Sequence, residues 1–501
     1  MRDALNAWLA EANASGNRLR AVEAAARSVE ADPWRVVQEA GQLARCSMET
    51  APRDCGLTAT LSVVSTNHPN ALVRVDAGSA YPAFDRNGRK RRGAFDTPAT
   101  MAHAAVTAAL QASRRNTGQA LDPSCGTGAF LVALSEQWSG DVIGIELDPV
   151  AAAVAAIAAP NAQIIVDDGL EIDILCDVIV GNPPFIPPER QNKNTRARLR
   201  KDMPWLVGRF DFAVPFAARS VERVRAGGGV GLILPEALMN QPYAQPLRER
   251  WLKRHAITHL THAEPFPGAQ VGVVIIGMEK GAGPAPLPNG LRPESLAQLD
   301  AVPFHPSLQP GDPEIVAKVR ANSNPLGEFA TVDTGVVSHG SHGGKAVLLH
   351  ATPTADRVPY VDAKDLVDNR TQWLDYRPET MHRPKDPSLF ESPKVLVQRL
   401  RGRGPIRAWV DRSGLYAGHT LTVVRPDRPP LSPERIHALI THPLVDGLLR
   451  MERGSRLDLY PKDVRSIPVP TPWLEQPDTP LEVALGLEAH EAERLLSFSL
   501  E

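Results

Sequence analysis

The sequence predicts an α/β protein whose main domain is a doubly wound, mostly parallel, Rossmann-like sheet. Between about residues 118 and 281, short runs of β-branched and apolar residues alternate with helical patterns, which is typical of β-α-β units. A glycine-rich turn closes the first of these strands and opens the next helix, as in many nucleotide-binding folds. The chain has 501 residues, a length that suits about two to four domains.

The region before the sheet, residues 1–85, is expected to be helical. It is rich in Ala, Glu, Arg and Leu, and its apolar residues recur at helical spacing. A basic run follows at 86–92. Thr97-Pro98 then has the pattern of a helix start, a hydroxyl cap followed by proline in the first turn. We expect the main domain to span 86–281.

Within the main domain, the expected elements alternate regularly. The strands are rich in Val, Ile and Leu and lie at 119–123, 141–147, 162–168, 176–182, 228–235 and 271–279. The helices lie between them at 128–138, 149–159, 210–224 and 246–255.

The remainder of the chain divides into three parts. Residues 282–324 begin with a stretch rich in Pro and Gly and are expected to form a linker. Short β-like runs within 325–475 predict a separate, mixed α/β C-terminal domain. Residues 476–501 are expected to form a polar helical tail.

Composition narrows the class of protein. Hydrophobic residues make up 43% of the chain and charged residues 22%, as in folded globular proteins. The sequence has neither an apolar run long enough to span a membrane nor a signal-peptide pattern, so we expect a cytoplasmic protein without a membrane partner. The 4 cysteines fit neither a zinc site nor a disulfide framework, and we expect reduced thiols and no metal.

Acidic residues stand at the ends of three successive expected strands. Asp122 opens the glycine turn that ends at Gly128, where the backbone can approach a ligand and a helix N-terminus follows. Glu146 ends the next strand, where a carboxylate can accept hydrogen bonds from ribose hydroxyls. Asp168 ends the third strand and could accept from an adenine amine. The pattern predicts a nucleoside-containing cofactor at this edge.

The fourth expected strand ends in Asn182-Pro183-Pro184-Phe185, and this turn indicates chemistry. The Asn182 side-chain oxygen and the Pro183 carbonyl are two acceptors for the N–H bonds of an adenine amine, which frees its lone pair to attack a sulfonium methyl group. The prolines stiffen the turn and preserve this alignment. Phe185 offers a face for stacking an extruded base.

These motifs together resemble the gamma-class DNA adenine-N6 methyltransferases, which include methyltransferases of restriction–modification systems. The matching segments are Thr-Pro (97–98), DPSCGTGAF (122–130), GIELDP (144–149), NPPF (182–185), 208–239 and AEPFPGAQVGVVII (263–276). The resemblance is close over 88–281 and looser over 325–475, which is similar to target-recognition domains. It implies transfer of a methyl group from S-adenosylmethionine to adenine N6 at specific sites in double-stranded DNA.

The resemblance also implies roles for matching residues. Thr97 would contact the methionine end of the cofactor, Glu146 the ribose and Asp168 the adenine amine, although a one-residue slip to Asp167 stays open. The other expected cofactor contacts are Asp122, Pro123, Cys125, Gly126, Gly128 and Asn182. The expected catalytic residues are Asn182, Pro183, Pro184 and Phe185, and Phe185 and Phe266 would sandwich the flipped base. Many relatives have Tyr where Phe185 stands, and Phe should stack as well.

Two basic clusters indicate contact with DNA. Residues 190–209 follow the catalytic turn and hold seven basic residues against one acid, with Arg196, Arg198, Arg200 and Lys201 as the expected DNA contacts. The second cluster lies in the C-terminal domain and runs through Arg399, Arg401, Arg403, Arg407 and Arg412, with the first three as the expected DNA contacts.

Several alternative functions share part of this pattern. RNA and protein N-methyltransferases use the same Asn-Pro-Pro-aromatic turn, although the large C-terminal domain favours DNA. Cytosine-N4 enzymes usually have Ser in place of Asn. A non-catalytic DNA-binding subunit predicts erosion of the turn or of the glycine loop, and neither is eroded. We find no convincing nuclease motif, so any restriction endonuclease is expected to be a separately encoded partner.

Overall fold

The structure is a computed structural model that divides the chain into two compact units, Met1–Pro310 and Gly311–Glu501. Each unit is described by itself. The described residues are 47–50, 60–65, 68–76, 97–264, 266, 272–299, 302–337, 348–378, 381, 384–400, 404–427, 429–454, 458–476 and 478–499.

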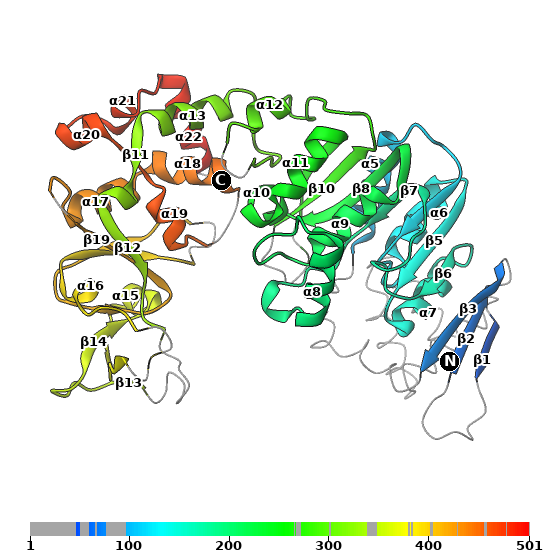
Figure 1. Ribbon diagram of the computed structural model, residues 1–501, viewed down its shortest axis with the longest axis horizontal. Coiled ribbons are helices and arrows are strands. Elements are labelled where there is room, and N and C mark those ends of the chain that lie inside the picture. The colour runs from blue at the N-terminus through cyan, green and yellow to red at the C-terminus, as the bar shows by residue number, and fades with distance from the viewer. Residues whose placement is uncertain are drawn as a thin grey trace. The chain divides into compact units, whose positions relative to one another are not determined.

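The first unit is built on a seven-stranded sheet, which Figure 1 shows in cyan and green. Its strands, from edge to edge, are β6 (Gln163–Val166), β5 (Asp141–Glu146), β4 (Gln119–Asp122), β7 (Cys176–Gly181), β8 (Val224–Pro235), β10 (Val273–Glu279) and β9 (Ala256–Ala263). The first five strands pair in parallel, whereas β10 is antiparallel to both β8 and β9. The predicted doubly wound, mostly parallel sheet is therefore confirmed.

Three helices, α5 (Ala99–Ala112), α6 (Ala129–Gln137) and α7 (Pro149–Ala158), pack in succession along the sheet. The closest approach is that of α5 to β8, where two glycines face the helix backbone. A Cβ atom added to Gly231 would lie 2.1 Å from the Ala105 carbonyl oxygen, and one on Gly229 would lie 1.9 Å from that of Ala109. The glycine run in β8 is therefore needed for this packing.

Strand order reverses at β4, because the chain next adds β5 on one side and later adds β7 on the other. In such sheets, ligands bind in the crevice beyond the carboxyl ends of the strands at this switch point. The remaining helical elements of the unit are η3 (Pro188–Arg190), α8 (Lys193–Asp202), α9 (Ala213–Glu222), α10 (Ala237–Asn240), η4 (Pro242–Ala244), α11 (Gln245–Arg254) and α12 (Pro293–Leu296).

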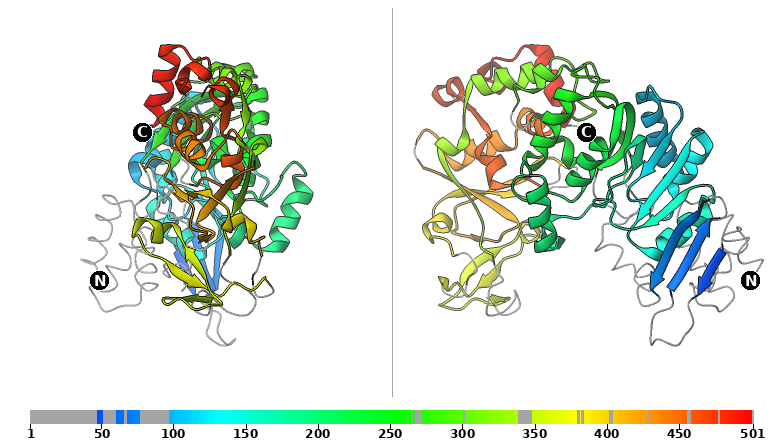
Figure 2. Two further views of the ribbon diagram at one scale, coloured as in Figure 1. Left: turned by 90° about the vertical axis from the view of Figure 1, so that its left-hand side faces the viewer. Right: turned by 45° about the vertical axis from the view of Figure 1, so that its right-hand side comes forward.

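The helical prediction for residues 1–85 is wrong for the part that the structure describes. That part forms an antiparallel three-stranded sheet, β1 (Ser47–Thr50), β2 (Thr60–Ser65) and β3 (His68–Asp76), drawn in blue in Figure 2. Apolar and polar residues alternate in Val-Arg-Val-Asp at the end of β3, a period-2 pattern that favours a strand. Residues 1–46 lie outside the described residues.

The linker prediction for 282–324 is also wrong, because most of this stretch is packed. Leu287, Leu291, Leu296 and Phe304 are all buried, and the Phe304 backbone N–H donates to the Met239 carbonyl at 2.9 Å. Apolar residues spaced among the prolines thus join the first unit. The boundary between units falls at residues 310 and 311 instead.

The second unit contains two four-stranded sheets and a short two-stranded one. Their strand orders are β12 (Ala330–Thr334)-β19 (Leu421–Pro426)-β16 (Lys394–Gln398)-β17 (Ala408–Asp411), β13 (Leu349–His350)-β15 (Gln372–Leu374)-β14 (Val358–Val361)-β18 (Tyr416–Ala417), and β11 (Ser323–Pro325)-β20 (Pro468–Pro470). Among the described residues of this unit, the helical elements are α13 (Asp312–Ala321), η5 (Leu326–Glu328), α15 (Ala363–Val367), α16 (Ser388–Glu391), α17 (Pro433–Ile440), α18 (Pro443–Arg453), α19 (Pro461–Arg465), α20 (Thr471–Glu475), α21 (Leu481–Ala484) and α22 (Ala489–Ser499).

The last helix, α22, is an integral part of this second unit. It packs against α18, and two ion pairs tie it to α13. Arg494 lies 2.8 Å from Asp312, which is 2% exposed, and Lys318 lies 2.7 Å from Glu491. Residues 312–321, which we predicted to be linker, therefore belong to the core of the second unit.

Candidate active site

The glycine turn between β4 and α6 is folded back onto the end of β5. Gly126 and Gly128 adopt positive φ angles of 52° and 85°, in the left-handed region that favours glycine. The Gly126 N–H donates to the Glu146 carboxylate at 2.8 Å, and the Cys125 N–H donates to the Ile145 carbonyl at 2.9 Å. The structure thus brings the predicted glycine loop and the predicted ribose-binding carboxylate together.

Glu146 is fixed by the backbone on both sides. Its second carboxylate oxygen accepts from the Asp148 N–H at 2.8 Å. The next residue, Leu147, is 65% exposed. The sequence analysis gave Leu147 no role; it lies between Glu146 and Asp148 at the end of β5, where an apolar side chain could contact a flat ligand.

Asp122 lies at the carboxyl end of β4 and is completely buried. One carboxylate oxygen accepts from the Ser124 N–H at 3.0 Å, whereas the other has no hydrogen-bond partner. Burial raises the pKa of Asp122 to about 8; the Ser124 N–H opposes this shift and the charge of Glu146 adds to it. Such a carboxyl group favours a cationic partner, because a cation would satisfy the orphaned oxygen and restore the charged form.

Asn182 follows β7 and reaches Thr97, which is 6% exposed and precedes α5. The Asn182 amide nitrogen donates to the Thr97 hydroxyl oxygen at 3.1 Å, and the buried Asn182 side-chain oxygen has no partner. Our prediction that Thr97 caps the following helix is wrong, since α5 begins at Ala99 and Pro98 is its cap residue without a side-chain cap bond. The Thr97 hydroxyl instead accepts from Asn182.

The two predicted base-stacking rings lie next to each other. The ring centroids of Phe185 and Phe266 are 6.2 Å apart and the rings are inclined at 60°. This tilted contact is a normal aromatic pair and leaves no parallel slot between the rings, so a base could enter only if one ring turned. Phe266 is 2% exposed, and residues 265 and 267–271 beside it lie outside the described residues.

The loop after β6 carries the predicted adenine contact. Asp168 is 32% exposed and accepts from the Leu170 N–H at 3.0 Å, whereas Asp167 is exposed and accepts from the Asp168 N–H at 2.7 Å. A Cβ atom on Gly169 would lie 1.8 Å from the Pro123 carbonyl oxygen. The close approach at Gly169 places this loop directly against the glycine turn.

A buried arginine holds the same loop from inside. Arg223 is 5% exposed and donates to the carbonyl oxygens of Gly169 and Leu170, the latter at 2.8 Å. Sequence reasoning missed this residue, because a single arginine at the end of an amphipathic helix carries no distinguishing signal.

The predicted DNA contacts near the catalytic turn lie on α8, and three of the four make contacts within the unit. Arg196 donates to the Pro188 carbonyl at 3.4 Å, and Arg200 donates to that of Gly208 at 2.5 Å. Arg198 pairs with Glu171 at 2.9 Å and lies 3.7 Å from Asp168. Lys201, also on this helix, is exposed.

Arg399, the described residue among the three expected DNA contacts of the second basic cluster, is partly buried in the second unit. Its guanidinium donates to the His419 carbonyl at 2.6 Å and lies over the Tyr460 ring at 4.6 Å from the centroid. These contacts hold the side chain within the unit. Arg401 and Arg403 lie outside the described residues.

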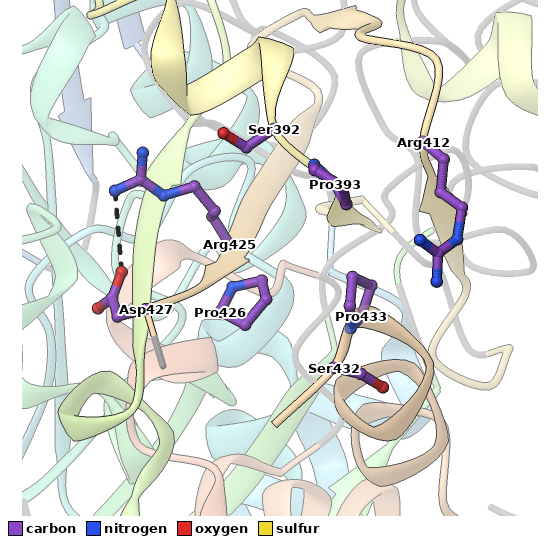
Figure 3. Close-up of a pocket in the computed structure, with 8 residues that line it drawn as sticks. All are labelled: Ser392, Pro393, Arg412, Arg425, Pro426, Asp427, Ser432 and Pro433. Atoms are coloured by element: carbon purple, nitrogen blue, oxygen red, sulfur yellow. Dashed lines mark ion pairs between the residues drawn. The ribbon is translucent and has the colours of Figure 1, made fainter. Parts of the chain in front are cut away.

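The second unit also contains a pocket of about 550 Å³, shown in Figure 3. It is lined by Ser392, Pro393, Arg412, Arg425, Pro426, Asp427, Ser432 and Pro433. Arg412 pairs with Glu434 at 2.5 Å and Arg425 lies 3.8 Å from Asp427, so each cation has a counter-charge. Arg412 belongs to the second basic cluster predicted from the sequence, and the balanced charges of the pocket give it no preference for an anion.

Among the residues that the structure describes, His, Cys, Asp and Glu side chains form no group of three or more that would suit a metal ion. Over the same residues, no helix combines the length and the apolar composition needed to span a membrane.

The seven-stranded sheet and its switch point have the architecture of the class I methyltransferase fold. Residues 171–267 match the model of the Eco57I restriction-modification methylase family, and this segment contains the Asn182–Phe185 turn. Relatives agree. The Type II methyltransferase M.PaeR7I of Pseudomonas aeruginosa is 36% identical over 72 residues, which are 14% of this chain and 12% of that protein.

A second relative matches a longer stretch at lower identity. Modification methylase CviBIII of Paramecium bursaria Chlorella virus NC1A is 26% identical over 168 residues, covering 32% of this chain and 42% of that protein. The matches therefore span less than half of these relatives' length. Over these segments, the chain is similar to restriction–modification DNA methyltransferases.

Among solved structures, the fold is similar to that of the Type IIL restriction-modification enzyme MmeI, whose structure was solved in complex with DNA. The TM-score is 0.51 at 13% sequence identity, and the match covers 79% of this chain and 71% of that chain. At this identity the likeness concerns the fold alone.

Proposed function

We propose that the chain is a site-specific DNA methyltransferase that transfers a methyl group from S-adenosylmethionine to N6 of a flipped-out adenine. Its role would be in restriction–modification or related defence, with a separately encoded endonuclease as partner. The proposal extends the family resemblance of residues 171–267 to the whole chain.

The residues at the sheet edge fit S-adenosylmethionine, a cationic nucleoside that supplies an electrophilic methyl group on sulfur. Glu146 would hold the ribose, Asp168 the adenine amine and Leu147 a face of the adenine ring. The orphaned, fully buried oxygen of Asp122 supports a cationic ligand in particular. Thr97 would lie toward the methionine end of the cofactor.

The observation that carries the proposal is the unpartnered side-chain oxygen of Asn182. A buried acceptor without a partner is costly to leave, which indicates that a ligand supplies the missing donor. Because the amide nitrogen donates to Thr97, the oxygen has a fixed direction. With the Pro183 carbonyl as second acceptor, Asn182 could hold the adenine amine while N6 gains the methyl group and loses one proton.

Support for DNA as the substrate comes from the basic helix α8, which lies soon after the catalytic turn. The solved structure of MmeI, similar in fold, contains DNA. Target recognition would fall to the second unit, in the region 325–475. Cytosine N4, RNA and protein remain the alternative substrates because the same acceptor pair could hold their nitrogen atoms.

The test is direct. The purified chain is incubated with methyl-labelled S-adenosylmethionine and unmethylated genomic DNA, and the digested nucleosides are separated. The expected product is N6-methyladenine at one sequence motif, and Asn182→Ala should give none. Label in N4-methylcytosine, in RNA or in protein, or a wild-type chain that binds the cofactor but transfers nothing, would each overturn the proposal.

A further inference from the structure

The peptide that follows Phe185 is held by hydrogen bonds from two neighbouring segments. The Ile186 carbonyl oxygen accepts from the Phe212 N–H at 3.0 Å and from the Gln191 side-chain amide at 2.9 Å. The segment that supplies Phe212 leads into α9, whose first residues are buried. The catalytic turn is thus anchored at its outgoing end to a packed helix.

Gln191 contributes to this anchor twice. Its amide nitrogen also donates to the Phe210 carbonyl at 2.7 Å, so the side chain bridges Ile186 and Phe210. Its oxygen is buried without a partner. Gln191 therefore ties the peptide after Phe185 to the segment that leads into α9.

Asp211 completes the arrangement from the other side of the same peptide. Its carboxylate accepts from the Ala213 N–H at 2.9 Å and from the Ile186 N–H. Burial raises the pKa of Asp211 to about 6, the charge of Glu189 adds to this shift, and both backbone N–H groups oppose it. Glu189 itself pairs with Arg209. Both polar groups of Ile186 are therefore held, and we call this set of bonds the Ile186 clamp.

We infer that Gln191 and Asp211 are positioning residues for methyl transfer, because the Ile186 clamp holds Asn182–Phe185 in the alignment that the reaction needs. The inference rests on the proposed function. Neither side chain contacts the reacting atoms; each acts through the backbone of Ile186. A small misplacement of reacting groups is enough to slow such a reaction greatly.

The test compares Gln191→Met, which keeps the side-chain volume but removes both donors, with Gln245→Met as a matched control. Gln245 is a partly exposed glutamine at the start of α11, and its side-chain amide donates to Glu249 at 2.7 Å. Gln191→Met should lower the single-turnover rate of methyl transfer at least about tenfold, with the Kd for S-adenosylmethionine within about twofold of wild type. The control should match wild type in both.

Asp211→Asn provides an independent variant and a pH signature. Wild-type transfer should slow as pH falls through about 6, because protonation of Asp211 removes an acceptor from the clamp. Asn retains one acceptor and does not titrate, so the variant should be only a few-fold slower at pH 8 and lose this part of the pH profile. An unchanged rate in Gln191→Met, or an equal loss of rate and cofactor affinity, would overturn the inference.

Amide hydrogen exchange in the unliganded chain separates this inference from the proposed function. The Phe212 and Ile186 amides should be protected in wild type and exchange at least tenfold faster in Gln191→Met. Protection without any methyl transfer in wild type would mean that the clamp exists and the proposed function is wrong. Equal exchange in both proteins would show that Gln191 does not hold the turn.

Discussion

The Thr97 hydroxyl oxygen accepts a 3.1 Å hydrogen bond from the Asn182 side-chain amide, which joins a residue two positions before α5 to the residue after β7. This bond determines which end of the amide faces Thr97. The side-chain oxygen of Asn182 is buried without a partner, and in the proposed function it accepts from the substrate amine.

The first prediction concerns this orientation. Thr97→Val removes the acceptor while keeping the shape, so the Asn182 amide should lose its fixed direction and methyl transfer should slow about tenfold or more. Thr97→Ser keeps the hydroxyl group and should stay near wild type. Single-turnover rates of the three proteins decide the question, and equal rates for Val and Ser would exclude an orienting role.

The second prediction concerns Glu146. Glu146→Ala should weaken S-adenosylmethionine binding about tenfold or more, because the variant loses the ribose acceptor and also leaves the Gly126 and Asp148 N–H groups without their partner. Glu146→Gln retains an acceptor and should bind more tightly than the Ala variant. Calorimetric titration measures both, and unchanged affinity in Glu146→Ala would remove this residue from the cofactor site.

The third prediction follows from the pKa of Asp122, which burial raises to about 8 in the folded protein. The unfolded chain has the ordinary, much lower value, so the folded state holds the proton more tightly. The stability that the protonated group contributes is complete below about pH 4 and is lost as pH rises through 8. Asp122→Asn should therefore be more stable than wild type at pH 9, by on the order of a few kcal/mol.

Thermal unfolding without cofactor, measured from pH 5 to pH 9, tests this prediction. The difference in Tm between Asp122→Asn and wild type should grow with pH. A variant that is less stable than wild type at pH 9 would show that Asp122 is charged and satisfied in the folded chain.

The fourth prediction separates two roles on α8. Arg198 pairs with Glu171 at 2.9 Å and reaches toward Asp168, so Arg198→Ala should raise the Kd for S-adenosylmethionine a few-fold. It should leave the salt dependence of DNA binding unchanged. Lys201→Ala should do the opposite and lower the log–log salt slope by about one, as expected for one lost phosphate contact. A reduced salt slope in Arg198→Ala would instead support the sequence-based prediction that Arg198 contacts DNA.

Sequence patterns predicted the central strands well because those strands are buried on both faces and are therefore continuously apolar. For example, β7 is buried at every residue. The edge strand β9 escaped prediction, because its half-exposed sequence Ala-Ile-Thr-His-Leu-Thr-His-Ala has little apolar pattern. The three N-terminal strands were missed because the residues before them are rich in Ala, Glu, Arg and Leu, a composition that favours helices.

The site residues that carry motifs could be placed from the sequence, whereas their partners could not. Asn182 and Glu146 stand in recognisable strand ends. The bond to Thr97 joins residues 85 positions apart, and the contacts of Gln191 and Arg223 are with backbone carbonyl groups, which any sequence provides. Such pairings depend on the folded geometry and leave no trace in residue types.

The two glycines of β8 that face α5 have an effect well beyond their own strand. Because any side chain at Gly231 would collide with the Ala105 carbonyl, substitution there must push α5 outward along its length. The helix begins two residues after Thr97, so the hydroxyl that orients Asn182 would move with it. The proposed site therefore requires glycine at position 231, although this residue would touch no ligand. We expect loss-of-function variants at Gly231 in a random mutagenesis screen.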